Sequence, residues 1–380
     1  MKPKEVETID QFSEEQQEVL NSIRISKIIV PVGIGILTVF YLLWRQFDPE
    51  EFAKINWTGH TLFWISFTLI LLVIRHLAYA TRLRILSEGE FSWKKCIELI
   101  FIWEFSSAVS PTSVGGSAVA FFVLAQEKLS TAKTATIVLY TIVLDSIFFI
   151  VGLPILYLIF GNSMIRPNMT GFGDIGGWGY YFLIAYLVMA TYASVFYYGL
   201  FVNPIQIKRF LVGFTRLKWL RKHRPKAVEL GNDMILASNA LKHHGFNFHL
   251  SAFLATATAW SCRFLLLNCL IIAFIRNIPL DFWTQFELFA RLEAMFIIIA
   301  FSPTPGGAGF VEILFGGFLS DYVTSPTYAT VISTIWRLFT YYAYLLAGAV
   351  IIPNWIRTIL NERRKRRLAK GKVRSRKKPR

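Results

Sequence analysis

The sequence contains few of the residues from which covalent frameworks and metal centres are built. It has three cysteines and six histidines among 380 residues. Cys96, Cys262 and Cys269 are too few and too widely separated for a disulfide framework or a zinc site. We therefore interpret them as packing residues, and we expect no metal ion and no other cofactor.

Short catalytic motifs are also missing. The chain has no HExxH zinc motif, no P-loop, no GxSxG nucleophile elbow and no carboxylate-rich motif suited to a metal and a diphosphate. These absences exclude the enzyme classes that such motifs define. They leave enzyme activity open in principle but favour a transporter.

Charged residues make up only 17% of the chain, against 54% hydrophobic residues and a mean hydropathy of +0.47. Several long runs carry few charges, which is typical of membrane-spanning helices. The composition predicts an all-α polytopic membrane protein. The net charge of +16 does not indicate nucleic-acid binding, because the basic residues cluster beside apolar spans, where topology and anionic lipid explain them better.

One apolar run is interrupted by proline and glycine at residues 302–307, which read Ser-Pro-Thr-Pro-Gly-Gly. Proline removes an amide donor and clashes with the preceding turn, and glycine opens backbone geometries closed to other residues, so a helix must break here. Inside a membrane, broken backbone is tolerated only where protein or a water-filled cavity surrounds it. The segment is therefore expected to be buried or to line a cavity.

The same pattern occurs once more, at residues 110–116, which read Ser-Pro-Thr-Ser-Val-Gly-Gly. Downstream of each break the next apolar helix carries one charge, Asp145 in the first half and Arg337 in the second, at the same offset from its Ser-Pro-Thr triplet. The repeated offset predicts two copies of one structural unit. Because the two charges occupy equivalent positions, they are candidates to approach one another, as a gate or as a static pair.

We predict about six full transmembrane helices and two re-entrant hairpins, each made of two short helices around a break. The residues on either side of the first break form runs too short to cross a hydrocarbon core, which requires about 20 helical residues. The predicted organisation is a cytosolic segment at 1–26, a first membrane half at 27–202 with a hairpin at 96–126, a basic cytosolic loop at 203–248, a second half at 249–352 with a hairpin at 284–319, and a basic cytosolic tail at 353–380.

The distribution of basic residues predicts the orientation. With six spans, two hairpins that return to the side they entered from, and a cytosolic N-terminus, 32 of the 40 Lys and Arg residues lie on the cytosolic side. The first hairpin then enters from the cytosol and the second from outside, so the repeats are inverted, as in many transporters. We expect a plasma-membrane protein with both termini in the cytosol.

Ten charged residues fall within apolar segments, where a charge near the bilayer centre costs at least ~2.5 kcal/mol. Arg75 and Glu98 lie close enough to the cytosolic face to reach it, and Glu287 and Arg291 are spaced to pair across one helical turn. Glu293 belongs to the same hairpin. The deeper residues, which we expect to be functional, are Glu104, Asp145, Arg263, Glu312 and Arg337.

The two breaks are candidate anion sites. A helix that begins inside a membrane exposes unpaired amide donors and a partial positive charge, which suit a phosphate group. The alternative is that proline and glycine only turn a hairpin, but their occurrence in both halves favours a site. The candidate residues at the breaks are Pro111, Thr112, Gly115, Gly116, Pro303, Thr304, Pro305, Gly306 and Gly307.

Arg263 and Arg337 are expected to neutralise the same phosphate. Glu104, Asp145 and Glu312 are candidates for coupling or gating. The inferred substrate is a membrane lipid with an anionic or phosphate-bearing head group, and the basic loop and tail are expected to contact anionic lipid at the cytosolic face.

The Pro-Gly-Gly-x-Gly-x-x-Glu pattern from Pro305 to Glu312, its looser copy at 110–117 and the helix that carries Asp145 resemble the flippase-like integral membrane family. That family is named after the transmembrane region of lysylphosphatidylglycerol synthase. The resemblance covers about residues 27–352 and implies movement of a phospholipid or other lipid-linked amphiphile between leaflets. After residue 360 the chain has no room for the soluble aminoacyl transferase domain, so synthase activity is not implied.

Two other functions fit the sequence. One is a membrane-embedded transferase acting on a polyprenyl-phosphate lipid or a phospholipid, with Glu312 or Asp145 as the base. The other is a non-catalytic scaffold whose basic tail recruits a partner. Movement of a fluorescent lipid across a liposome membrane discriminates between all three.

Overall fold

A computed structural model describes residues 49–53, 57–109, 113–127, 129–167, 169, 174–217, 219–301, 314–315 and 317–376. These residues form helices joined by turns and short connections, and no β-strand occurs among them. The prediction of an all-α fold is confirmed.

Five helical segments of the described chain are long and apolar enough to cross a membrane. They are α4 (Gly59–Leu86), α7 (Thr131–Phe160), α8 (Asp174–Tyr197), α11 (Phe246–Phe274) and the continuous run of α14 (Pro326–Arg337), η6 (Leu338–Tyr342) and α15 (Ala343–Arg376). The helix is favoured in such segments because it satisfies every backbone polar group internally. The sixth predicted span, which begins the first membrane half at about residue 27 and ends at about residue 44, lies outside the described residues.

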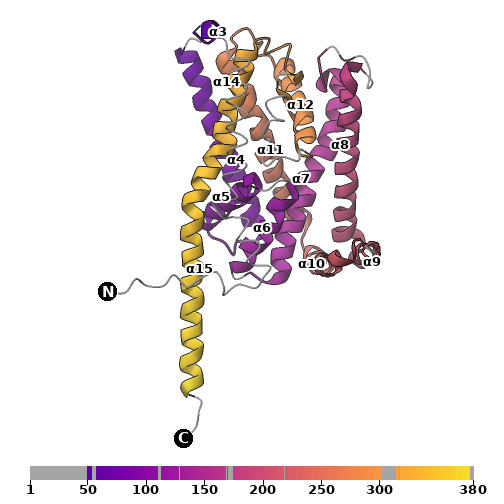
Figure 1. Cartoon of the computed structure of the whole chain (residues 1–380), viewed down its shortest axis with the longest axis vertical. Coiled ribbons are helices and arrows are strands. Elements are labelled where there is room, and N and C mark those ends of the chain that lie inside the picture. The colour runs from indigo at the N-terminus through magenta and orange to yellow at the C-terminus, as the bar shows by residue number, and fades with distance from the viewer. Residues whose placement is uncertain are drawn as a thin grey trace, which may run out of the picture.

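Three shorter helices lie against this bundle: α5 (Trp93–Val109), α6 (Ser113–Gln126) and α12 (Phe282–Ile299). With 17 and 14 residues, α5 and α6 are about 26 and 21 Å long, shorter than the ~30 Å hydrocarbon core. They pack against each other. Figure 1 shows α5 and α6 in the lower part of the molecule and α12 in its upper part.

Polar side chains fix where several of these helices begin. The Ser130 hydroxyl accepts a hydrogen bond from the Lys133 amide at 3.2 Å at the start of α7. At the start of α12 the Asp281 carboxylate accepts from the amides of Trp283 and Thr284 at 3.0 and 3.1 Å. These are N-caps, which satisfy amide donors that have no partner inside the helix.

The buried side chains form two apolar cores, one above the other. The lower core, around Leu83, Ile102, Leu124 and Ile137, joins the ends of α4 and α7 to α5, α6 and α15. The upper core is centred on Phe264, Leu292 and Phe315, and it joins α7, α8 and α11 to α12 and α14. Several helices, among them α4, α7 and α11, contribute residues to both cores. Each of these helices passes from one core to the other where the two cores meet.

The lower end of the molecule brings several separate chain segments together. Lys133 at the start of α7 lies 3.3 Å from Glu88, which follows α4, and His244 lies 3.7 Å from the same carboxylate. Trp355 of α15 donates a hydrogen bond to Glu127 at 2.6 Å. The turn after α4, the start of α7, the segment before α11 and the lower part of α15 therefore share one end, below which α15 projects (Figure 1).

The central segment expected as a loop is largely helical. The helix α8 continues through the π-turn η3 (Tyr198–Val202) into α9 (Pro204–Phe214), and η4 (Arg221–His223) leads into α10 (Arg224–Leu241). Both surface helices lie at the lower end (Figure 1). The remaining short elements are α3 (Pro49–Ala53) and η2 (Gly161–Met164).

Candidate functional site

A layer of charged residues lies where the lower and upper cores meet. Along α4, Leu71 belongs to the upper core and Ala78 to the lower core, with Arg75 between them. Along α7, the change between the cores falls at Asp145. We define the central charge layer as Arg75 and Asp145, their ion-pair partners Glu104 and Arg82, and the neighbouring Arg263 and Arg337.

Arg75 binds both a carboxylate and a hydroxyl, although its Nε has no hydrogen-bond partner among the described residues. Its side chain is 0% exposed, and its Nη2 donates to both carboxylate oxygens of Glu104 at 2.8 and 2.7 Å. Its Nη1 donates to the Tyr344 hydroxyl at 3.3 Å, and that hydroxyl lies 3.2 Å from His76 Nδ1. The predicted coupling residue Glu104 is therefore held by a buried arginine, in a network that joins α4, α5 and α15.

Asp145 is held in a second network. Its Oδ1 accepts hydrogen bonds from Arg82 Nη1 at 2.5 Å and from Trp260 Nε1 at 3.0 Å. Arg82 also reaches the Thr256 hydroxyl at 3.3 Å. The sequence left open whether Asp145 pairs with Arg337, and the structure gives its partners as Arg82 and Trp260.

Arg82 was not among the deep charges that the sequence analysis singled out as site residues. The structure continues α4 to Leu86 and buries Arg82, at 6% exposure, beside Asp145. The signal was present in the spacing, because Arg75, Tyr79 and Arg82 are four and three residues apart and share one face of a helix. The Tyr79 ring lies between them, 5.2 Å from the Arg75 guanidinium and 4.8 Å from that of Arg82.

Arg263 has different surroundings from those of Arg75 and Arg82. Its guanidinium lies over the Phe296 ring at 4.7 Å and over the Trp260 ring at 5.3 Å. The side chain is half-buried, and its Nε is fully buried without a hydrogen-bond partner. Within the described residues it makes no hydrogen bond or ion pair, although it lies in electrostatic range of Arg75 and Glu104.

Arg337 occupies the last position of α14, directly before the π-turn η6. It is 2% exposed, and its guanidinium lies 4.6 Å from the Tyr341 ring and 5.9 Å from the Tyr342 ring. Single π-turns within long helices occur frequently at functional sites. The second of the two equivalent charges is thus placed in the layer at a local irregularity of its helix.

A third cluster lies on α12, away from the central charge layer. Arg291 is 3% exposed and binds Glu287 at 2.7 Å, as the four-residue spacing predicted. It also binds both oxygens of Asp321 at 2.5 and 2.7 Å, and Tyr322 donates to Glu287 at 3.4 Å. All charges in this cluster have partners, which indicates a structural role.

Most residues predicted at the two helix breaks lie outside the described part of the chain. Gly115 and Gly116 are described and lie in the first turn of α6, which begins at Ser113. The predicted residues outside the described part are Pro111, Thr112, Pro303, Thr304, Pro305, Gly306, Gly307 and Glu312. Among the described residues, no group of three or more His, Cys, Asp and Glu side chains could hold a metal ion.

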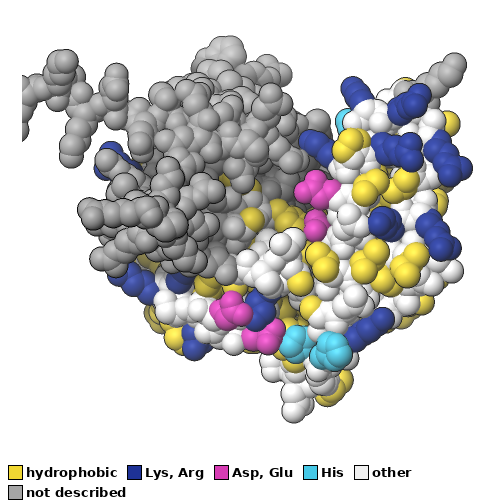
Figure 2. All heavy atoms as spheres, turned by 90° about the horizontal axis from the view of Figure 1, so that it is seen from below, with side chains coloured by type: hydrophobic (Ala, Val, Ile, Leu, Met, Phe, Trp, Pro, Cys, Tyr) yellow, Lys and Arg dark blue, Asp and Glu magenta, His cyan; other side chains and the backbone are white. Residues whose placement is uncertain are grey.

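The surface helices at the lower end carry basic and apolar side chains together. Figure 2 shows Lys and Arg beside hydrophobic side chains over the part of this face that α9 and α10 form. Phe210, Phe214 and Trp219 are exposed there, at 61%, 56% and 72%. Arginine side chains beside exposed aromatic rings are typical of segments that lie at the membrane–water interface.

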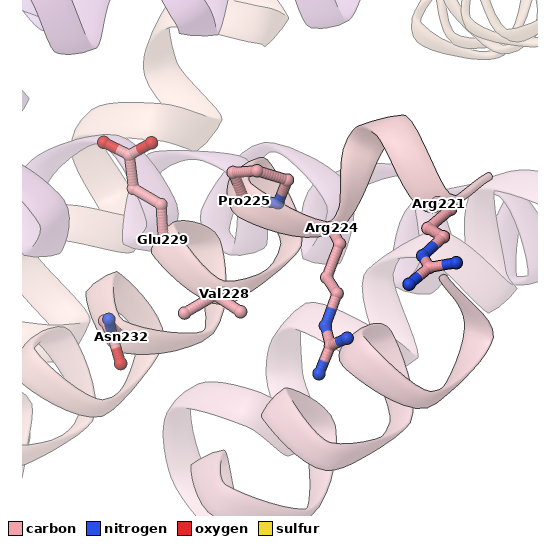
Figure 3. A pocket seen from close by; sticks show the side chains of 6 residues that line it. All are labelled: Arg221, Arg224, Pro225, Val228, Glu229 and Asn232. Carbon is pink, nitrogen blue, oxygen red and sulfur yellow. The ribbon is translucent and has the colours of Figure 1, made fainter. Parts of the chain in front are cut away.

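A surface pocket opens at the start of α10. Arg221 and Arg224 approach it from one side, and Glu229 points away from them (Figure 3). Partial burial, reinforced by the charge of Glu229, raises the pKa of the nearby Asp233 to about 6. The residues that line the pocket are Arg221, Arg224, Pro225, Val228, Glu229 and Asn232.

Comparison with known proteins places most of the chain in one family. Residues 28–348 match the family described as the lysylphosphatidylglycerol synthase TM region. A UPF0104 membrane protein of Archaeoglobus fulgidus is 25% identical over 291 residues, which cover 73% of this chain and 81% of that protein. No solved structure matches the chain.

Proposed function

Because the chain belongs to the family of the lysylphosphatidylglycerol synthase transmembrane region, we propose that it moves a phospholipid or other lipid-linked anionic amphiphile between the two leaflets of a membrane. The observation that carries this proposal is Arg263, a cation in the central charge layer with neither an ion pair nor a hydrogen bond among the described residues. A cation held at this depth is costly unless an anion compensates it.

The chemistry of Arg263 suits a phosphate group. Guanidinium presents several donors in a fixed planar fork that matches phosphate oxygens, and stacking on aromatic rings holds the fork in place. Phe296 and Trp260 supply those rings. A lipid phosphate that crosses the membrane would find its counter-charge at the level where the two apolar cores meet.

The other residues predicted for the site take defined places in this proposal. Backbone amides at the two breaks would donate hydrogen bonds to the phosphate, one break on each side of the membrane. The breaks run from Pro111 to Gly116 and from Pro303 to Gly307. Arg337 would help to neutralise the charge of the phosphate. Glu104 and Asp145 would act as gates, because each now holds an arginine that could otherwise bind the phosphate. Glu312 remains a proposed coupling residue.

The proposed architecture is an inverted repeat with two re-entrant hairpins. The position of α5 and α6 in the lower part of the molecule, and of α12 in the upper part, supports it (Figure 1). The proposed sixth span at 27–44 would complete the first half.

The lower end is the proposed cytosolic face of the plasma membrane. It carries the basic surface helices and the projecting α15, and the positive-inside rule places such segments in the cytosol. Exposed aromatic rings and arginines on α9 and α10 support contact with anionic lipid at this face.

Reconstitution into liposomes with a fluorescent phospholipid tests the function. The purified protein should transfer the label between leaflets, and Arg263→Gln should slow transfer at least about tenfold, because a charge-assisted hydrogen bond contributes roughly 1.5–3 kcal/mol. Arg276→Gln is the matched control, since Arg276 lies outside the layer and donates to Thr58 at 2.5 Å. No transfer by the wild type would contradict the proposal, and chemical modification of the lipid without transfer would favour the transferase.

A further inference from the structure

Glu293 is a buried carboxylate that neither of the charge networks includes. It lies on α12, is 1% exposed, and its Oε1 is fully buried without a hydrogen-bond partner among the described residues. It is directed at Gly152 of α7, where an added Cβ would lie 2.8 Å from Oε1. The absence of a side chain at Gly152 is what makes room for the carboxyl group.

The surroundings of Glu293 are apolar. Its neighbours along α12, Leu292 and Ala294, belong to the upper core, as do Phe149 and Leu153 on either side of Gly152. An ionised carboxylate in such surroundings loses its hydration without gaining a counter-charge, at a cost that is usually avoided by taking up a proton. The geometry therefore favours the neutral acid.

The ionisable groups on the elements packed against α12 do not neutralise Glu293. Those that belong to the upper half of the molecule are Asp145 and Tyr157 of α7, Tyr180, Tyr181 and Tyr186 of α8, Cys262, Arg263 and Cys269 of α11, Arg166 beyond η2, and Asp321 and Tyr322 beside Arg291, with Glu287 and Arg291 on α12 itself. Asp145 is bonded to Arg82 and Trp260, Tyr186 donates to the Ile150 carbonyl, and Arg291 holds Glu287. Within the described residues none of them bonds to Glu293.

A metal cation fits the position less well than a proton. Sodium or calcium requires several oxygen ligands around one point. In the described part of the chain, Oε1 of Glu293 has no hydrogen-bond partner, and no metal-binding group of three or more acidic, histidine or cysteine residues occurs.

We propose that Glu293 is a proton-binding site that is loaded and unloaded once in each lipid transfer, so that a proton gradient drives the movement. This inference rests on the proposed function and names its energy source. In each cycle the O–H bond of the acid breaks, the proton passes to water on one side, and a proton from water on the other side forms the bond again.

The position of Glu293 links proton exchange to motion of α12. Because the carboxyl group is 1% exposed and lies against Gly152 of α7, it can meet water only when the packing of α12 changes. Phe296, three residues further along α12, packs against Phe149 at 5.8 Å and holds the guanidinium of Arg263 at 4.7 Å. A movement of α12 that exposes Glu293 therefore also moves the ring on which the proposed phosphate-binding arginine rests.

The decisive experiment measures lipid transfer in liposomes that carry a proton gradient. One pH unit changes the proton activity tenfold, so the wild-type rate should change by up to about tenfold per unit for a one-proton cycle and lose this response when a protonophore is added. Glu293→Gln keeps the size of the side chain but cannot ionise, and its rate should be independent of the gradient. Glu98→Gln is the control, since Glu98 is part-exposed and paired with Lys95 at 3.2 Å, and it should respond as the wild type does.

A wild-type response that survives in Glu293→Gln would overturn the proposal, as would a response to a sodium gradient instead of a proton gradient. A second measurement does not depend on transport. The infrared spectrum of the purified protein at neutral pH should contain the carbonyl band of a protonated carboxylic acid, and Glu293→Gln should lose it. If no lipid moves but the band is present and assigned to Glu293, the transport function fails and the proton site stands. If the band is missing, the proton site fails.

Discussion

Arg75 and Arg263 lie in the same layer of the molecule but differ in what surrounds them. Arg75 is fully buried, with a bidentate carboxylate and a tyrosine hydroxyl as partners. Arg263 is half-buried, rests on two aromatic rings and has no hydrogen bond or ion pair in the described structure. A buried charge paired with an opposite charge holds helices together, whereas a charge without an ion pair is available to a ligand.

The largest expected effect tests the structural role of the ion pair between Arg75 and Glu104. Glu104→Gln removes the counter-charge of Arg75 and should reduce the free energy of unfolding by about 3–5 kcal/mol, because an unpaired buried charge remains. Thermal unfolding in detergent measures the effect. Arg263→Gln serves as the matched variant and should change stability by less than about 1 kcal/mol. An equal loss of stability in both variants would remove the distinction between the two arginines.

The approach of α15 to α5 offers the next test. A Cβ at Gly348 would lie 2.2 Å from Phe105 Cδ2, and Phe105 neighbours Glu104 on α5. Gly348→Ala should therefore separate these helices and cost about 1–3 kcal/mol, the usual penalty of overpacking. The control is Gly213→Ala, because nothing lies within 4 Å of that position. Unchanged stability of Gly348→Ala would show that this contact does not fix the Arg75 network.

A smaller effect is expected from the tyrosine that completes the network. Tyr344→Phe keeps the ring but removes the hydroxyl that lies 3.3 Å from Arg75 Nη1 and 3.2 Å from His76 Nδ1. We expect a loss of about 1 kcal/mol of unfolding free energy, the usual contribution of one hydrogen bond. The same melting measurement, with lipid transfer recorded alongside, should show reduced stability with little change in transfer rate. A selective loss of transfer would assign Tyr344 to the transport path.

The smallest effect is expected at Asp233, a carboxylate at the surface and outside the central charge layer. Burial raises the pKa of Asp233 from 3.8 to about 6, so folding favours its protonated form, and its contribution to stability falls as the pH rises from about 4 to about 6. Asp233→Asn should raise the melting temperature slightly above pH 6 and leave it unchanged below pH 4. A change of the same size at both pH values would show that Asp233 acts through packing and not through its charge.

The long apolar segments were predictable because each must satisfy its own backbone in a membrane, and the helix is the local solution. Five of the predicted spans are present as helices, and the sixth lies outside the described residues. The pair formed by Glu287 and Arg291 was also predictable, because four residues make one helical turn. The partner of Asp145 was not, because it comes from a helix 63 positions away in the sequence.

The residue pattern determined the membrane class of this protein, its long apolar helices and most of the deep charges among which a site was sought. Those properties depend on hydropathy, helix periodicity and the cost of charge in hydrocarbon, all of which act locally along the chain. Only the tertiary structure decided that Glu104 and Asp145 are paired, that Arg263 is not paired within the described residues, and that Glu293 is sealed against Gly152. Whether a charge is paired depends on which helices pack side by side, and the sequence of a single helix does not contain that information.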